Sequence, residues 1–149
     1  MISKKAIFNE VDRLLNEKIS ITELAMKEAQ SAANNETKSS AGDKYETGRA
    51  MSQNEKDINA RHLADLIKMK RALDLIDPVT PLNKVELGAI VKTDELTYFI
   101  SIGLGIIQLK GENVMTISAI SPIGQCMIGR VEGDSFEWRG NEEFIRKVL

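Results

Sequence analysis

The chain of 149 residues is short of several residue types that would mark particular classes of protein. Its single cysteine, Cys126, excludes an intramolecular disulfide and a cysteine-rich zinc site. Its single histidine, His62, has no partner cysteine or histidine and is a poor candidate for a metal ligand. No apolar run approaches the ~18–20 residues that a membrane helix needs. Disulfide scaffolds, zinc modules and membrane spans are therefore not expected.

The chain also lacks an excess of charge of either sign. It has 20 basic and 22 acidic residues, a net charge of −2, which argues against a nucleic-acid binder that depends on a broad basic face. The N-terminal stretch MISKKAIFNEVDRLL is charged throughout and has no apolar core of the kind found in signal peptides. We therefore expect a cytoplasmic protein with no membrane contact and no small-molecule substrate.

Proline, glycine and aromatic residues are scarce in the first half only. All three prolines, eight of the ten glycines and five of the seven aromatic residues lie beyond residue 77. Residues 1–77 carry 13 basic and 13 acidic residues, against 7 and 9 in residues 78–149. One half is charge-dense and nearly free of helix breakers, while the other is rich in turn residues. This contrast predicts an α+β protein with one domain at 1–77 and a second at 78–149.

The first half has the apolar spacing of two long helices. The first series comprises Ile7, Val11, Leu14, Ile21, Ala25 and Ala32, with Lys18 and Glu28 in the skipped positions, and the second comprises Ile58, His62, Leu66, Met69, Leu73 and Ile76. The small, polar stretch between them contains two glycines and predicts a turn. We expect an antiparallel α-helical coiled-coil hairpin with its tip at about 37–50. Pro78 closes the second helix, since the residue before a proline disfavours helical geometry.

Two carboxylates, Asp43 and Glu46, lie three residues apart at this tip, between Gly42 and Gly48. If the segment is helical, both lie on one face. Alone they make a poor Mg²⁺ site, because Mg²⁺ keeps much of its water and takes one or two carboxylates together with phosphate oxygens. The pair acts on a metal only if another molecule supplies the remaining ligands. The alternative is a solvated charged loop.

The second half has the composition of short strands separated by turns. The predicted strands are residues 85–92, 96–102, 106–109, 114–120, 135–138 and 144–149. One short helix interrupts them, with Ser121 as its N-cap, Pro122 in its first turn and Gly129 at its end. We expect a small antiparallel sheet packed on this helix.

Several segments of the chain resemble the Gre-type bacterial transcript cleavage factors. ISPIGQCMIGRVEGD at 120–134, with TYFI at 97–100, resembles the C-terminal signature of that family. VELGAIV at 85–91 resembles the strand that opens the same domain, and LIKMKRALDLIDP at 66–78 resembles the end of the second long helix. GDKYET at 42–47 matches the family's tip pattern of a glycine followed by two acids three residues apart. The resemblance covers nearly the whole chain.

The resemblance implies a coiled-coil hairpin followed by an FKBP-like domain, and a transcription elongation factor that binds RNA polymerase through its secondary channel. Asp43 and Glu46 would be the catalytic acids, which help to hold a Mg²⁺ shared with the polymerase active site and so promote cleavage of backtracked transcripts. The protein would be an accessory factor and not an enzyme by itself. The segment Ser121, Pro122, Ile123 and Gly124 would contact the polymerase.

Two departures from the family pattern keep other functions open. Lys44 stands between the two acids, and Gly48 weakens the start of the second helix by about 1 kcal/mol relative to alanine. The protein would then be a regulator that occupies the channel without cleavage, or an unrelated coiled-coil interaction module. Near the tip, Lys38, Lys44 and Arg49 are candidates for contacts with the nascent RNA, or are simply solvated.

Overall fold

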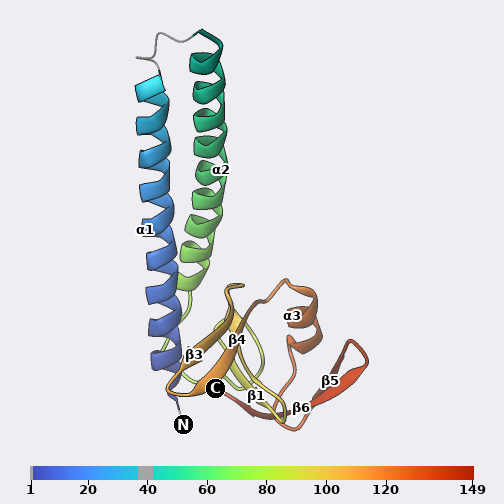
Figure 1. Ribbon diagram of the computed structural model, residues 1–149. Helices are drawn as coiled ribbons and strands as arrows, with labels where there is room; N and C mark the ends of the chain where they lie inside the picture. Colours follow the sequence, from blue (N-terminus) through green and yellow to red (C-terminus); the bar gives the residue numbers. More distant parts are fainter. Residues whose placement is uncertain (1, 37–41) are drawn as a thin grey trace. The chain divides into compact units, whose positions relative to one another are not determined.

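The computed structural model describes residues 2–36 and 42–149, and for residues 33, 36 and 42–46 it describes the backbone alone. Two helices come first, followed by strands and one short helix, so the predicted α+β class is confirmed (Figure 1). The elements in chain order are α1 (Lys4–Glu36), α2 (Gly42–Asp74), β1 (Ile90–Thr93), β2 (Thr97–Ser101), β3 (Gly105–Leu109), β4 (Glu112–Ser118), α3 (Pro122–Met127), β5 (Ser135–Trp138) and β6 (Asn141–Val148).

The chain divides into two compact units. The helical unit is Leu14–Lys70, and the sheet unit combines Met1–Arg13 with Arg71–Leu149. The first turns of α1 and the last turn of α2 therefore belong with the sheet. Within the helical unit α1 and α2 lie alongside each other (Figure 1). Leu24 of α1 and Leu63 of α2 line one groove between them.

The buried side of α1 differs from the predicted one. Its buried residues are Ile7, Val11, Leu15, Thr22 and Ala29. Ile21, which the apolar spacing placed on this side, is 61% exposed, so the prediction is one residue out of step from residue 14 onward. Leu14 and Leu15 are both apolar, and a period of 3.6 accommodates either after Val11. Thr22 can be buried because its hydroxyl donates to the carbonyl oxygen of Lys18 at 2.9 Å.

The second helix follows the prediction over its C-terminal half only. Leu66 and Leu73 are buried, as predicted, and so is Ile76, which lies just beyond the end of α2. Ile58 is 61% exposed, so its predicted place on the buried side is wrong, and His62, which has the same spacing, lies at the surface. A helix that packs against a single neighbour buries only a narrow stripe, and apolar residues beside that stripe remain in contact with water.

The helices extend further into the connecting segment than the turn-like composition indicated. Residues 34–36 are the end of α1 and residues 42–50 are the start of α2, although both stretches are polar. At its other end α2 stops at Asp74, a few residues before Pro78. There the Asp77 carboxylate accepts hydrogen bonds from the backbone N–H groups of Val79 and Thr80 at 2.9 and 3.2 Å. These bonds stabilise the turn that leads out of the helix.

The sheet is mixed, not antiparallel as predicted. Its strand order is β3-β4-β2-β1-β6-β5. All neighbours are antiparallel except β2 and β4, which pair in parallel from Thr97 opposite Val114 to Ser101 opposite Ser118. The chain leaves β2, passes to the edge position as β3 and returns as β4 between the two. Strand composition indicates where strands lie but does not indicate such a crossing, so the sequence could not reveal the parallel pair.

The sheet unit has a core on the side that α3 covers. Tyr98 and Ile100 of β2, Met127 of α3, Phe136 of β5 and Ile145 of β6 are all at most 2% exposed and belong to one apolar cluster. The Tyr98 and Phe136 rings meet edge to face, with centroids 6.3 Å apart.

The predicted ends of α3 are confirmed. The Ser121 side chain accepts a hydrogen bond from the backbone N–H of Gly124 at 3.1 Å, as an N-cap residue does. Pro122 occupies the first turn. Gly129, with a φ of +84°, follows the end of the helix in the left-handed conformation that glycine tolerates.

The start of α1 is tied to the segment that follows α2. Lys4 is only 7% exposed, and its ammonium donates to the carbonyl oxygen of Thr80 at 2.9 Å. Burial lowers the pKa of Lys4 from its ordinary value, opposed by the nearby carboxylates of Asp77 and Glu86. None of the helices in the described part of the chain has the length and apolar character that crossing a membrane requires.

The close contact at Gly124 provides a test of this fold. A Cβ atom at this position would overlap the carbonyl oxygen of Ser118 and lie 3.0 Å from that of Ala119. We expect Gly124→Ala to lower the free energy of unfolding by about 1–3 kcal/mol, because the turn between β4 and α3 must open. Gly103→Ala is the matched control, since a Cβ at Gly103 meets no atom within 4 Å. Urea denaturation measures both, and equal stabilities of the two variants would contradict the observed packing.

Candidate functional site

The two acids predicted at the tip occupy adjacent turns at the start of a helix. The backbone of Asp43 and Glu46 belongs to the beginning of α2, which starts at Gly42. The side chains of Asp43, Lys44 and Glu46 lie outside the described residues, and so does Lys38 entirely. Arg49, the other predicted RNA contact, is exposed.

The side chains that the structure describes form no ready-made metal site. Among the side chains that the structure describes, no three histidine, cysteine, aspartate or glutamate groups converge in a way that could hold an ion. The predicted Mg²⁺ ligands do not belong to that set, because their side chains are not described. A pair of carboxylates would in any case need oxygen ligands from another molecule.

The predicted polymerase-binding segment combines residues of two kinds. Ser121 and Gly124 are used internally: the Ser121 hydroxyl caps α3 and donates to the carbonyl oxygen of Ser118 at 2.6 Å, and Gly124 is buried. Pro122 is exposed and Ile123 is half-buried. Pro122 and Ile123 present apolar side-chain surface that a partner could contact, whereas the half-buried Ser121 hydroxyl is engaged within the chain.

The residue before this segment was missed by the sequence analysis. Ile120 is 85% exposed, more than any other large apolar residue in the described part of the chain. Its exposure follows from its position in the turn between β4 and α3, where the chain leaves the sheet before the helix begins. The Ser-Pro pair at 121–122 marks the start of a helix. Ile120 precedes that pair and therefore falls in the turn before the helix, which is a signal that it could be exposed.

A buried carboxylate joins three strands of the sheet. Glu143 of β6 is 7% exposed. The Tyr98 hydroxyl of β2 lies 2.8 and 3.0 Å from its two oxygens, and the Thr93 hydroxyl of β1 lies 2.9 Å from one of them. Desolvation, the hydrogen bond to Glu143 and the negative charges of Glu143 and Glu95 raise the pKa of Tyr98 above its ordinary value. The phenol therefore stays protonated and continues to donate.

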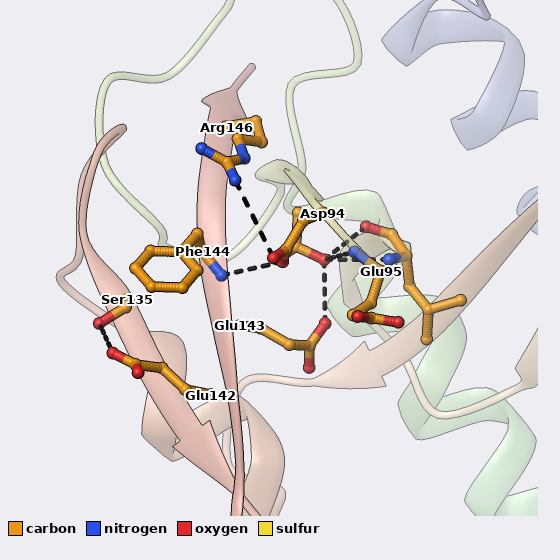
Figure 2. A network of polar contacts seen from close by, with 9 residues as sticks. Asp94, Glu95, Ser135, Glu142, Glu143, Phe144 and Arg146 are labelled. Carbon is orange, nitrogen blue, oxygen red and sulfur yellow. Dashed lines mark hydrogen bonds and ion pairs between the residues drawn. The ribbon is translucent and has the colours of Figure 1, made fainter.

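The strand that carries Glu143 is held in place by its other neighbours. The carboxylate of Asp94 accepts a hydrogen bond from the Phe144 backbone N–H at 3.0 Å and lies 4.0 Å from the Arg146 guanidinium (Figure 2). The adjacent Glu142 turns to the opposite side of β6, where it accepts a hydrogen bond from the Ser135 hydroxyl at 2.8 Å. This alternation is the ordinary pleat of a strand, and it turns Glu143 inward on the same face as the buried Ile145.

An open cleft of about 680 Å³ adjoins this carboxylate. Its lining includes the carboxylates of Glu95, Glu142 and Glu143 and the apolar side chains of Met115, Ile123 and Trp138. The sequence analysis did not predict this cleft, whose residues come from four separate segments of the chain. Trp138 is half-buried, and the Arg139 guanidinium lies 5.1 Å from the centre of its ring.

The chain matches no protein-family model, and no curated protein sequence matches it.

The hydrogen bonds of Glu143 predict a difference in stability between two hydroxyl deletions. Tyr98→Phe removes a donor from a buried carboxylate, and we expect a loss of about 2 kcal/mol in the free energy of unfolding. Ser135→Ala removes a donor from the exposed Glu142 carboxylate and should cost less than about 1 kcal/mol, because water replaces the lost bond. Urea denaturation at neutral pH measures both. Equal losses would show that the Glu143 carboxylate is not buried as described.

Stability should also fall at high pH because of Tyr98. In the unfolded chain Tyr98 ionises near its ordinary pKa of 10.0, whereas in the folded protein its pKa is raised. Above pH 10 the unfolded state therefore binds fewer protons, and the free energy of unfolding falls as pH rises. Relative to Tyr98→Phe, the wild-type protein should lose about 1 kcal/mol between pH 9 and pH 11. A difference between the two proteins that is constant over this interval would contradict the raised pKa.

Proposed function

We propose that the protein is a Gre-type transcription elongation factor that binds RNA polymerase through its secondary channel and stimulates cleavage of backtracked transcripts. The observation that carries the proposal is the helical backbone of α2 from Gly42 onward, with Asp43 and Glu46 within its first turns. A helix of 33 residues is about 50 Å long, so such a helix can carry an acidic pair far from the opposite end of the helix.

The proposed chemistry needs both acids and a second molecule. Two-metal phosphoryl transfer uses carboxylates to hold ions that stabilise the attacking and the leaving oxygens. Asp43 and Glu46 would supply part of the coordination of one Mg²⁺, and the polymerase and the RNA phosphate would supply the rest. The protein itself would not be an enzyme, because the incomplete ligand set becomes a site only within the complex.

The finer architecture is part of the same proposal. Residues 1–77 would form an antiparallel coiled-coil hairpin and residues 78–149 an FKBP-like domain. The two helices side by side in the helical unit, and the six-stranded sheet with its short helix, support this reading. Ile120, Pro122 and Ile123 would be the apolar part of the surface that docks on the polymerase, since their side chains are exposed or half-buried.

A second candidate function is a regulator that occupies the channel without stimulating cleavage. Lys44 stands between the two acids in the sequence, and its ammonium would compete with Mg²⁺ for them. Gly48 lies within the second turn of α2, where glycine weakens a helix by about 1 kcal/mol relative to alanine. Both features favour binding to the polymerase over organisation of a metal.

A transcript-cleavage assay with a backtracked RNA polymerase complex tests the proposal. We expect the wild-type protein to accelerate shortening of the RNA in the presence of Mg²⁺. The double variant Asp43→Ala, Glu46→Ala should lose at least about 100-fold in that rate, the effect of removing several kcal/mol of transition-state stabilisation. Its binding to the polymerase in a pull-down should remain within about twofold, because the acids are distant in sequence from the proposed docking residues.

The matched control is the double variant Glu55→Ala, Asp65→Ala, which removes the same charge from exposed positions further along α2. It should retain the wild-type cleavage rate. Full activity of the Asp43→Ala, Glu46→Ala variant would contradict the assignment of the acids. Binding of the wild-type protein without cleavage at any Mg²⁺ concentration would identify the regulator, and absence of binding would leave only the coiled-coil interaction module.

A further inference from the structure

The Glu143 carboxylate is held by neutral hydrogen-bond donors. It is 7% exposed, and its hydrogen-bond partners, the hydroxyls of Tyr98 and Thr93, are neutral. Among the residues that the structure describes, no lysine, arginine or histidine forms an ion pair with it. A buried carboxylate is costly to desolvate, and neutral donors compensate this only in part. A cation brought by a ligand would find a hydrogen-bonded, preorganised acceptor here.

The cleft beside Glu143 is acidic, because Glu95, Glu142 and Glu143 all line it, and Met115, Ile123 and Trp138 form its apolar part. The charge of Glu95 acts together with that of Glu143 on the Tyr98 hydroxyl, so the two acids lie near the same point. None of the described residues that line the cleft is basic. A volume of about 680 Å³ is within the range of ligand sites in proteins.

We propose that this cleft binds a basic side chain, an arginine or lysine, presented by a segment of a partner protein. The cation would lie by Glu95 and Glu143, and the aliphatic stem would cover the apolar wall that includes Met115. Long basic side chains combine an apolar stem with a charged end, which matches this division. The Trp138 ring would stack on the charged end of the basic side chain, because the face of an aromatic ring attracts a cation. The Arg139 guanidinium lies 5.1 Å from the centre of the Trp138 ring, so this indole already has one cation beside it.

A protein segment fits the site better than a free cation or a metal. Ile120 and Pro122, which precede the cleft residue Ile123 in the chain, present apolar surface that a small cation would leave in water. Among the described residues, no three acidic groups converge closely enough to hold a metal ion, although Glu95, Glu142 and Glu143 all line the cleft. The proposal is independent of transcript cleavage, because it concerns the sheet unit and its test contains no polymerase.

Tryptophan fluorescence of the full chain measures this binding directly, because Trp138 is the single tryptophan in the sequence. The probes are the capped peptide acetyl-Ala-Leu-Arg-Leu-Ala-amide, the same peptide with neutral citrulline in place of arginine, and the free cation agmatine. We expect a saturable change with the arginine peptide and about tenfold weaker binding of the citrulline peptide, as one charge-assisted contact provides. Agmatine should bind more weakly than the arginine peptide.

Two variants locate the cation. Glu95→Gln should weaken the arginine peptide about three- to tenfold and leave the citrulline peptide unchanged, since only the charged probe uses that carboxylate. Glu112→Gln, an equal change of charge at an exposed residue of β4 outside the cleft, should affect neither peptide. Equal affinities of the arginine and citrulline peptides, or an unchanged affinity of Glu95→Gln for the arginine peptide, would overturn the proposal. So would an affinity for agmatine equal to that for the arginine peptide. The absence of any response of the Trp138 indole N–H in NMR spectra would overturn it as well.

Discussion

The hydrogen bonds from Tyr98 and Thr93 to the Glu143 carboxylate are the interaction on which the arrangement of the sheet unit depends. They join β1, β2 and β6, and the bonded residues are up to 50 positions apart in the sequence. A buried acid tolerates few alternative positions, because each displacement leaves an oxygen without a donor. The network therefore holds β6 in register and, with it, the cleft that opens beside it.

The helical unit is under a different constraint, which is the continuity of its backbone. Both helices run for 33 residues. The helical unit buries only a narrow stripe of apolar and small residues, with Leu15 and Thr22 among them and Ile21 and Ile58 left in contact with water. So narrow a stripe gives limited apolar burial, and intrahelical hydrogen bonding and helix-favouring composition carry more of the stability. The near absence of proline and glycine from residues 1–77 is the sequence counterpart of this requirement.

The two candidate sites differ in how far the sequence could predict them. Asp43 and Glu46 were recognisable because a tip pattern is local: two acids, three residues apart, between glycines. The cleft was not, because Glu95, Ile123 and Trp138 approach one another only through the sheet and α3. The parallel pairing of β2 with β4 escaped prediction for the same reason, since it depends on the route the chain takes between strands. The shifted stripe on α1 has another cause, the adjacent leucines at 14 and 15 that satisfy the helical period equally well.

The sequence by itself determined the α+β class, the two long helices, the cap and end of α3, and the acidic pair near the start of α2. These features depend on residues within a few positions of one another, where periodicity, capping and proline geometry act directly. Only the tertiary structure decided which leucine of α1 is buried, the strand order of the sheet, and the isolation of the Glu143 carboxylate beside an acidic, aromatic-lined cleft. Burial and charge balance are properties of neighbours in space, and those neighbours are distant in the chain.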